Sequence, residues 1–226
     1  MQIQELIIYS PNIKAQADFY SNLLGLSIIK EDSNSISIQI GTSLLKIEYK
    51  AETTPYHFAI NIPANKEVEA LDWLKSKVTI LKDEANEIQD FESWNSKAMY
   101  FYDEDKNIVE LIARKNLQNN SVEIFDSNFF LNISEIGLPT FDIEKEFNIL
   151  HKQSGIEIYD GGFERFCAIG DENGLFICID KKQKDWFPTN DKAYSSDFEV
   201  QFKEKGKEYS IQYKNNELKS IQYNLN

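Results

Sequence analysis

Residues 5–26 read ELIIYSPNIKAQADFYSNLLGL, an apolar run followed by a polar and apolar mixture. The run is rich in isoleucine and closes at Pro11, which is typical of a β-strand. After Asn12, a residue type that suits a helix N-cap, apolar side chains recur every three or four positions as far as Gly25. Glycine is common just beyond a helix end. The stretch therefore predicts a strand followed by a helix.

Three short strand patterns separated by turn residues follow this pair, so residues 1–50 predict one β-α-β-β-β module. The same order recurs over residues 55–114, where a strand pattern closed by Pro63 precedes an amphipathic segment with Asn65 as its expected cap. A repeated unit constrains the architecture more strongly than any single element. The predicted strands of the two modules are 2–9, 26–32, 35–41, 44–50, 56–63, 78–83, 97–103 and 107–114.

The remainder of the chain repeats the module less completely. Residues 115–128 are polar and rich in asparagine, and we interpret them as a linker. A third copy follows, with a strand at 131–141, a helix at 142–155 and three further strand patterns. After a loop at 182–196, the patterns at 197–204, 208–215 and 218–225 predict a fourth copy that lacks its helix.

The net charge, the length of the apolar runs and the cysteine count exclude several classes of protein. The chain has 226 residues and a net charge of −13, with only two arginines. Binding to nucleic acid requires clustered basic residues, so this class is not expected. No apolar run approaches the roughly 20 residues that span a bilayer, and the N-terminus does not resemble a signal peptide. Two cysteines are too few for a disulfide framework, so we expect a reducing, cytoplasmic environment.

One carboxylate stands out among apolar neighbours. In the strand pattern 107–114, Glu110 lies on the same face as Ile108 and Ile112. A buried carboxylate needs a partner, which would be a lysine, an arginine or a metal ion. Glu5 lies on one strand face with Ile3 and Ile7, so this carboxylate also needs a partner if it is buried.

Three stretches resemble one superfamily. They are residues 5–26, the His57-containing strand YHFAINIP at 56–63, and MYFYDEDKNIVELIAR at 99–114. Together they resemble the vicinal oxygen chelate superfamily, which includes glyoxalase I, extradiol dioxygenases and bleomycin-resistance proteins, and they are closest to the glyoxalase-like members. The resemblance covers residues 1–114 and is faint over 129–226.

This resemblance implies an α+β fold in which tandem βαβββ modules form a cup-shaped mixed sheet. Paired modules would occupy residues 1–114, as 1–50 and 55–114, and a degenerate βαβββ-like lobe would occupy 129–226. The family places metal ligands on the first and last strands of each module. The matching positions in this chain are Glu5, Glu48, His57 and Glu110, which would hold Zn, Ni, Co or Mn.

Two positions depart from the pattern. Glu5 stands where the family has histidine or glutamine, and Glu48 shares its strand face with Lys46 and Lys50. In the third copy Glu135 repeats the position of Glu5, but Asp197 replaces His57 at the start of the fourth copy. We therefore expect a structural lobe there rather than a second working site.

The implied function is a metal-dependent lyase or isomerase that acts on a small oxygenated substrate, with Glu110 or Glu5 as the catalytic base. The alternative is a metal-free protein of the resistance type, which binds a small molecule in the cup. An extradiol-type dioxygenase is less favoured. Its iron site needs two histidines, and of the two in this chain one, His151, lies in the predicted third helix rather than on a ligand-bearing strand. No membrane or nucleic-acid partner is expected, and a homodimer is left open.

Overall fold

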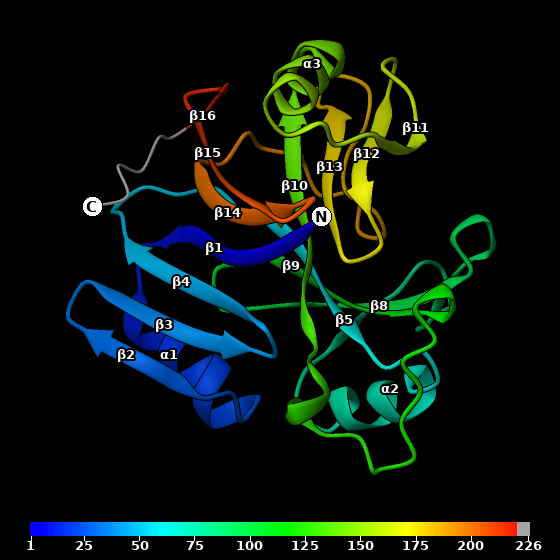
Figure 1. Cartoon of the computed structure of the whole chain (residues 1–226). Helices are drawn as coiled ribbons and strands as arrows, with labels where there is room; N and C mark the ends of the chain where they lie inside the picture. The colour runs from blue at the N-terminus through cyan, green and yellow to red at the C-terminus, as the bar shows by residue number, and fades with distance from the viewer. Residues whose placement is uncertain (221–226) are drawn as a thin grey trace.

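The computed structural model describes residues 1–220 and has two mixed β-sheets with few helices (Figure 1). The first sheet has, in spatial order, β16 (Glu217–Ser220), β15 (Lys207–Lys214), β14 (Phe198–Glu204), β1 (Gln2–Ser10), β4 (Ser43–Tyr49), β3 (Ser35–Ile40) and β2 (Ile28–Asp32). The strand predicted at 218–225 begins as β16, and its residues 221–226 lie outside the described part of the chain.

The second sheet carries the middle of the chain. Its strands are, in order, β11 (Ile158–Gly161), β12 (Phe166–Asp171), β13 (Gly174–Asp180), β10 (Asn132–Thr140), β5 (His57–Ile62), β9 (Ile108–Arg114), β8 (Ser96–Tyr102) and β6 (Ile80–Leu81), with β7 (Gln89–Phe91) also paired to β8. Short 3₁₀ turns connect the elements: η2 (Glu92–Trp94), η3 (Lys115–Leu117) and η4 (Ser127–Phe129).

The helices are α1 (Ile13–Ala17), which continues as the π-helical turn η1 (Asp18–Leu23), α2 (Glu67–Lys75) and α3 (Ile143–Ser154). The Asn12 side chain accepts a hydrogen bond from the backbone of Ala15 at 3.1 Å, which confirms the predicted cap. The predicted cap at Asn65 is wrong. Its side chain bonds to the backbone of Ser121 instead, and Lys66 takes the N-cap position.

The modules pair with partners from distant parts of the chain. β1 of the first module pairs antiparallel with β14, and β5 of the second module pairs antiparallel with β10 of the third. The modules at 1–50 and 55–114 therefore lie in different sheets, and the strands between residues 132 and 220 contribute to both of these sheets. The strand edges of the first module are completed by the fourth and those of the second by the third, within one chain.

Burial separates the two faces of the second sheet. One face joins a continuous core with α2, α3 and the first sheet, through residues such as Phe58 and Val109. The opposite face carries a smaller apolar cluster that includes Ala59, Ile112 and Trp186. Because side chains alternate along a strand, Glu110 falls on this second face. Among residues 1–220, each helix is too short or too polar to cross a membrane.

Candidate metal centre and pocket

Three polar side chains meet on the open face of the second sheet. His57 begins β5, Glu110 lies in the neighbouring strand β9, and Glu135 lies in β10 on the other side. Ala59 pairs with Glu110 in the parallel ladder and with Glu135 in the antiparallel one. The two carboxylates therefore flank one position of β5, and His57 is the next residue on the same face.

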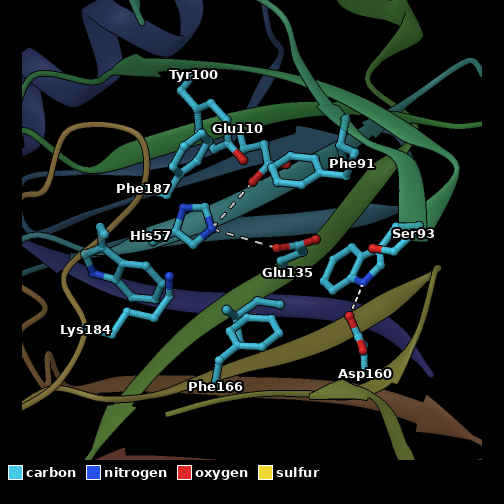
Figure 2. Close-up of a pocket in the computed structure, with 14 residues that line it drawn as sticks. His57, Phe91, Ser93, Tyr100, Glu110, Glu135, Asp160, Phe166, Lys184 and Phe187 are labelled. Carbon is cyan, nitrogen blue, oxygen red and sulfur yellow. Dashed lines mark hydrogen bonds and ion pairs between the residues drawn. The ribbon is translucent and has the colours of Figure 1, made fainter. Parts of the chain in front are cut away.

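The three side chains converge on a small volume (Figure 2). His57 Nε2 lies 3.6 Å from Glu110 Oε2 and 3.8 Å from Glu135 Oε2. One potential ligand atom from each residue lies within 4.8 Å of the other two. Each residue is at least 94% removed from solvent. Water is therefore largely excluded from these groups by the protein.

The histidine is oriented by a backbone group. His57 Nδ1 lies 3.1 Å from the carbonyl oxygen of Ile108. A carbonyl only accepts hydrogen bonds, so Nδ1 carries a proton, and Nε2 is the ring nitrogen that faces the two carboxylates. A backbone carbonyl behind the ring is a common support for a metal-binding histidine.

The second carboxylate has a buried cationic partner. The Arg114 guanidinium forms an ion pair with Glu135 Oε1, which leaves Oε2 facing His57. Arg114 is fully buried, its Nε donates to Asn61 Oδ1 at 3.1 Å, and its guanidinium lies 5.5 Å from the centre of the Trp94 ring. These contacts fix the position of the Glu135 carboxylate.

Glu110 has no such cation beside it among the described residues. Burial raises the pKa of Glu110 well above its usual range, and the charge of Glu135 raises it further. The more distant Arg114 and a hydrogen bond with Tyr100 act in the opposite direction. The two carboxylates therefore differ: Glu135 is paired with an arginine, whereas burial favours the protonated form of Glu110.

The residues fit a divalent ion. One imidazole nitrogen and two carboxylate oxygens are ligands that Zn, Ni, Co and Mn accept. Three acceptor groups that face one another are unfavourable without a cation or a proton between them.

The repeat of the modules also defines a fourth potential ligand position, the one in the third module that corresponds to Glu110 in the second. Ala59, two residues after His57, pairs with Glu110. Gly137, two residues after Glu135, pairs with Ile177. Ile177 therefore occupies the position that corresponds to Glu110, and this fourth potential ligand position is apolar.

A cavity of about 350 Å³ opens above this cluster. It is lined mainly by aromatic and aliphatic side chains from β7, β8 and β12 and from the loop before β14. The lining residues are His57, Phe91, Ser93, Trp94, Tyr100, Glu110, Ile112, Glu135, Asp160, Phe166, Ile177, Lys184, Trp186 and Phe187. Small-molecule sites have this composition, an apolar wall with a few convergent polar groups.

The structure brings together only two of the four predicted ligands, His57 and Glu110. Glu5 and Glu48 lie on the first sheet, on β1 and β4. Glu5 accepts a hydrogen bond from Gln201 at 2.7 Å, and Glu48 forms an ion pair with Lys46 at 2.5 Å. A single site made of the four predicted residues is therefore not what the structure contains, because the first and second modules lie in different sheets.

Sequence reasoning did not assign Glu135 and Arg114 to the site. Glu135 was recognised as the repeat of Glu5, but the third module was expected to be a structural lobe. Arg114 is one of only two arginines, and it lies four residues after Glu110 on the same strand face. Whether any of these residues binds metal stays a prediction.

Solved structures share this fold. A protein from Bacillus subtilis subsp. subtilis str. 168, provisionally named a dioxygenase, is 15% identical with a TM-score of 0.58, over 79% of this chain and 63% of that one. A glyoxalase I mutant from Zea mays is 14% identical with a TM-score of 0.54, over 78% of this chain and 66% of that one. This chain spans under two thirds of the length of either structure. No protein-family model and no curated protein sequence matches it.

Proposed function

We propose that this chain, which has the fold of the vicinal oxygen chelate superfamily, is a metal-dependent lyase or isomerase that acts on a small oxygenated substrate. The supporting observation is the convergence of His57 Nε2, Glu110 and Glu135 in a buried cluster beneath a cavity. These three residues would hold a divalent ion. When bound, the ion would act as a Lewis acid toward neighbouring oxygen atoms of the substrate.

The charges of the cluster support a cation. The ionised carboxylates of Glu110 and Glu135 carry two negative charges, and Arg114 offsets one of them. One negative charge then remains in a buried volume, and either a proton on Glu110 or a cation must neutralise it. A bound divalent ion would make the net charge of the cluster positive, and the floor of the cavity would then attract the oxygen atoms of a substrate.

The two carboxylates would have different roles. Glu135 Oε1 is occupied by Arg114, so this residue would serve as a fixed ligand. Glu110 lines the cavity and has no cationic partner of its own, so it would move a proton between adjacent carbon atoms of the substrate. Glu5, the other predicted base, lies on the first sheet and contributes nothing to this cavity.

A second candidate is a metal-free binding protein. The aromatic lining favours it, because such a wall binds flat molecules without any chemical step. Pairing of Glu110 to a lysine would strengthen this candidate, but no such ion pair exists among residues 1–220. A dioxygenase with two histidines and one carboxylate is less well supported, because the cluster has one histidine and two carboxylates.

Metal loading tests the proposal. The purified protein is exposed in turn to Zn, Ni, Co, Mn and Fe(II), freed of loosely bound metal and assayed for content, with His57→Ala and Glu135→Gln beside it. The matched control is Glu5→Gln, a carboxylate change on the other sheet. We expect near-stoichiometric metal in the parent and in Glu5→Gln, and loss in the other two variants. Equal content in all four proteins, or none in the parent under any condition, would overturn the proposal.

A further inference from the structure

Lys184 is the lysine of the cavity wall, and among residues 1–220 its ammonium group has no anionic partner. It is half-buried on the loop between β13 and β14, and among the described residues its side chain makes neither an ion pair nor a hydrogen bond. The contact it does make is with the face of Phe166, whose centre lies 6.0 Å from Nζ. Partial desolvation of an ammonium group without an anion is costly, and an anionic ligand in the cavity would remove this cost.

Aromatic rings surround the space in front of Lys184. Phe91 lies 6.3 Å from Trp94 and 6.1 Å from Phe187, and Phe187 lies 5.8 Å from Tyr100, as measured between ring centres. Trp94 in turn lies 6.3 Å from Phe166. These rings form a nearly continuous wall. A cavity of about 150 Å³ can hold benzene, so the observed 350 Å³ suits a substituted ring with a short polar chain.

We propose that Lys184 binds the carboxylate of the substrate, and that the substrate is a small aromatic acid whose ring packs against this aromatic wall. The inference rests on the proposed function for the reaction, and it adds the class of molecule that enters the cavity. In Figure 2 Lys184 and Phe166 lie on one side of the His57–Glu135 cluster, and Phe91 and Ser93 lie on the other. The carboxylate would therefore lie on the Lys184 side of the cluster, with the ring directed along the aromatic wall toward Phe91.

An acid suits this cavity better than a cation, although aromatic walls also bind cations. Two of the three acidic groups that line the cavity have partners: Asp160 accepts a hydrogen bond from Trp94 Nε1 at 2.6 Å, and Glu135 is paired with Arg114. Arg165 adds positive charge close to Lys184 and, after burial, is the second influence that lowers the pKa of this lysine. The chain as a whole has a net charge of −13, so a local positive site favours the entry of an anion.

Four probes separate charge from shape: phenylacetate, neutral phenylacetamide, non-aromatic cyclohexylacetate and cationic phenethylammonium. Binding is measured by calorimetry and by tryptophan fluorescence, with metal-loaded and metal-free protein. We expect phenylacetate to bind at least about 10-fold more tightly than phenylacetamide, the effect of one charged hydrogen bond. It should also bind more tightly than cyclohexylacetate. Lys184→Met should abolish the preference for the acid and Lys184→Arg should retain most of it.

The control is Lys182→Met, which removes an exposed lysine of the same loop whose ammonium group lies over Phe141 and away from the cavity lining. Equal binding of acid and amide, tightest binding of phenethylammonium, a preference that survives in Lys184→Met, or no binding of any probe would each overturn the inference. Metal content is measured separately. A preference that depends on Lys184 in a protein that retains no metal would refute the proposed function while the acid-binding role of Lys184 remained.

Discussion

The two sheets present the same backbone frame with different chemistry. In the second sheet Ala59 pairs with the two carboxylates of the site. In the first sheet Ile7 occupies the same place, two residues after the starting position, and it pairs with Lys46 and with Glu199. The positions that correspond to His57, Glu110 and Glu135 are therefore Glu5, Lys46 and Glu199. The shared strand register alone does not create a metal site. In the first sheet one of the three corresponding residues is a lysine, whose ammonium group cannot act as a metal ligand and instead pairs with a carboxylate.

Burial is the second difference between the sheets. The side chains of Lys46 and Glu48 retain 29% and 36% of their exposure, whereas those of Glu110 and Glu135 retain 4%. Water therefore screens the charges of the first sheet, and the charges of the second interact strongly. The comparison teaches that a strand register shared by both sheets becomes a candidate metal site only where its residues are metal-binding types and are buried.

The largest expected effect comes from removing the arginine that supports the buried site. Arg114→Met should lower the free energy of unfolding of the metal-free protein by about 3–5 kcal/mol, because it leaves the Glu135 carboxylate without its charge partner. The matched change on the first sheet, Lys46→Met, should cost under about 1 kcal/mol. Urea unfolding of both variants measures the contrast. Similar losses in the two variants would show that burial does not distinguish the sheets.

A second contrast lies in the turns that precede the last strand of each module. Before β9, Asp103 is buried, accepts a hydrogen bond from Tyr20 at 2.9 Å, and has a pKa raised to about 6, chiefly by burial. Before β4, the turn is Gly41–Thr42 and has no such carboxylate. The raised pKa means that the folded protein holds this proton more tightly than the unfolded chain. The contribution of Asp103 to stability therefore falls as pH rises from about 4 to about 6, and it stays lower above that range.

The expected size of this effect is about 3 kcal/mol, from a shift of about two pH units. It is measured as the difference in free energy of unfolding between the parent and Asp103→Asn at pH 4 and at pH 7, which cancels the constant cost of altered hydrogen bonds. The free energy of unfolding of the parent should fall relative to that of Asp103→Asn as pH rises. A difference that does not change with pH, or that changes in the opposite direction, would contradict the assignment.

The third prediction concerns the cover of the second sheet. A Cβ atom at Gly137 would lie 2.7 Å from the Trp186 ring, which itself lies 4.8 Å from the His57 ring. Gly137→Ala should displace this tryptophan, cost about 1–3 kcal/mol and shift its fluorescence to longer wavelength. Gly162→Ala is the control, because nothing lies within 4 Å of its added Cβ atom. An unchanged spectrum in Gly137→Ala would show that Trp186 does not cover the site.

The sequence was sufficient for the modules and not for their pairing. Alternation and turn residues mark each strand locally, so the βαβββ repeat could be predicted with its helices at about the observed positions. The choice of partner for β1 and β5 depends on contacts between segments far apart in the chain, such as Glu5 with Gln201. Local patterns contain no information about such contacts.

The same reason explains the partial prediction of the site. His57 and Glu110 come from one module, and their shared face follows from strand alternation and the resemblance. Glu135 comes from another module, so its place beside them depends on the pairing of β10 with β5. Glu48 was assigned from the resemblance, because local patterns do not determine the register of β4 against β1. The observed ladder puts Lys46 at the position that corresponds to Glu110.

The smallest expected effect tests the first sheet directly. Glu48→Gln removes one partner of an ion pair with Lys46 that is partly open to solvent, so it should change the free energy of unfolding by under about 1 kcal/mol. It should leave the metal content unchanged, whereas the matched Glu110→Gln removes a ligand from the buried cluster and should lower it. The two proteins are compared by metal analysis after identical loading. Loss of metal in Glu48→Gln would mean that the first sheet also carries ligands, and the contrast between the sheets would then rest on burial alone.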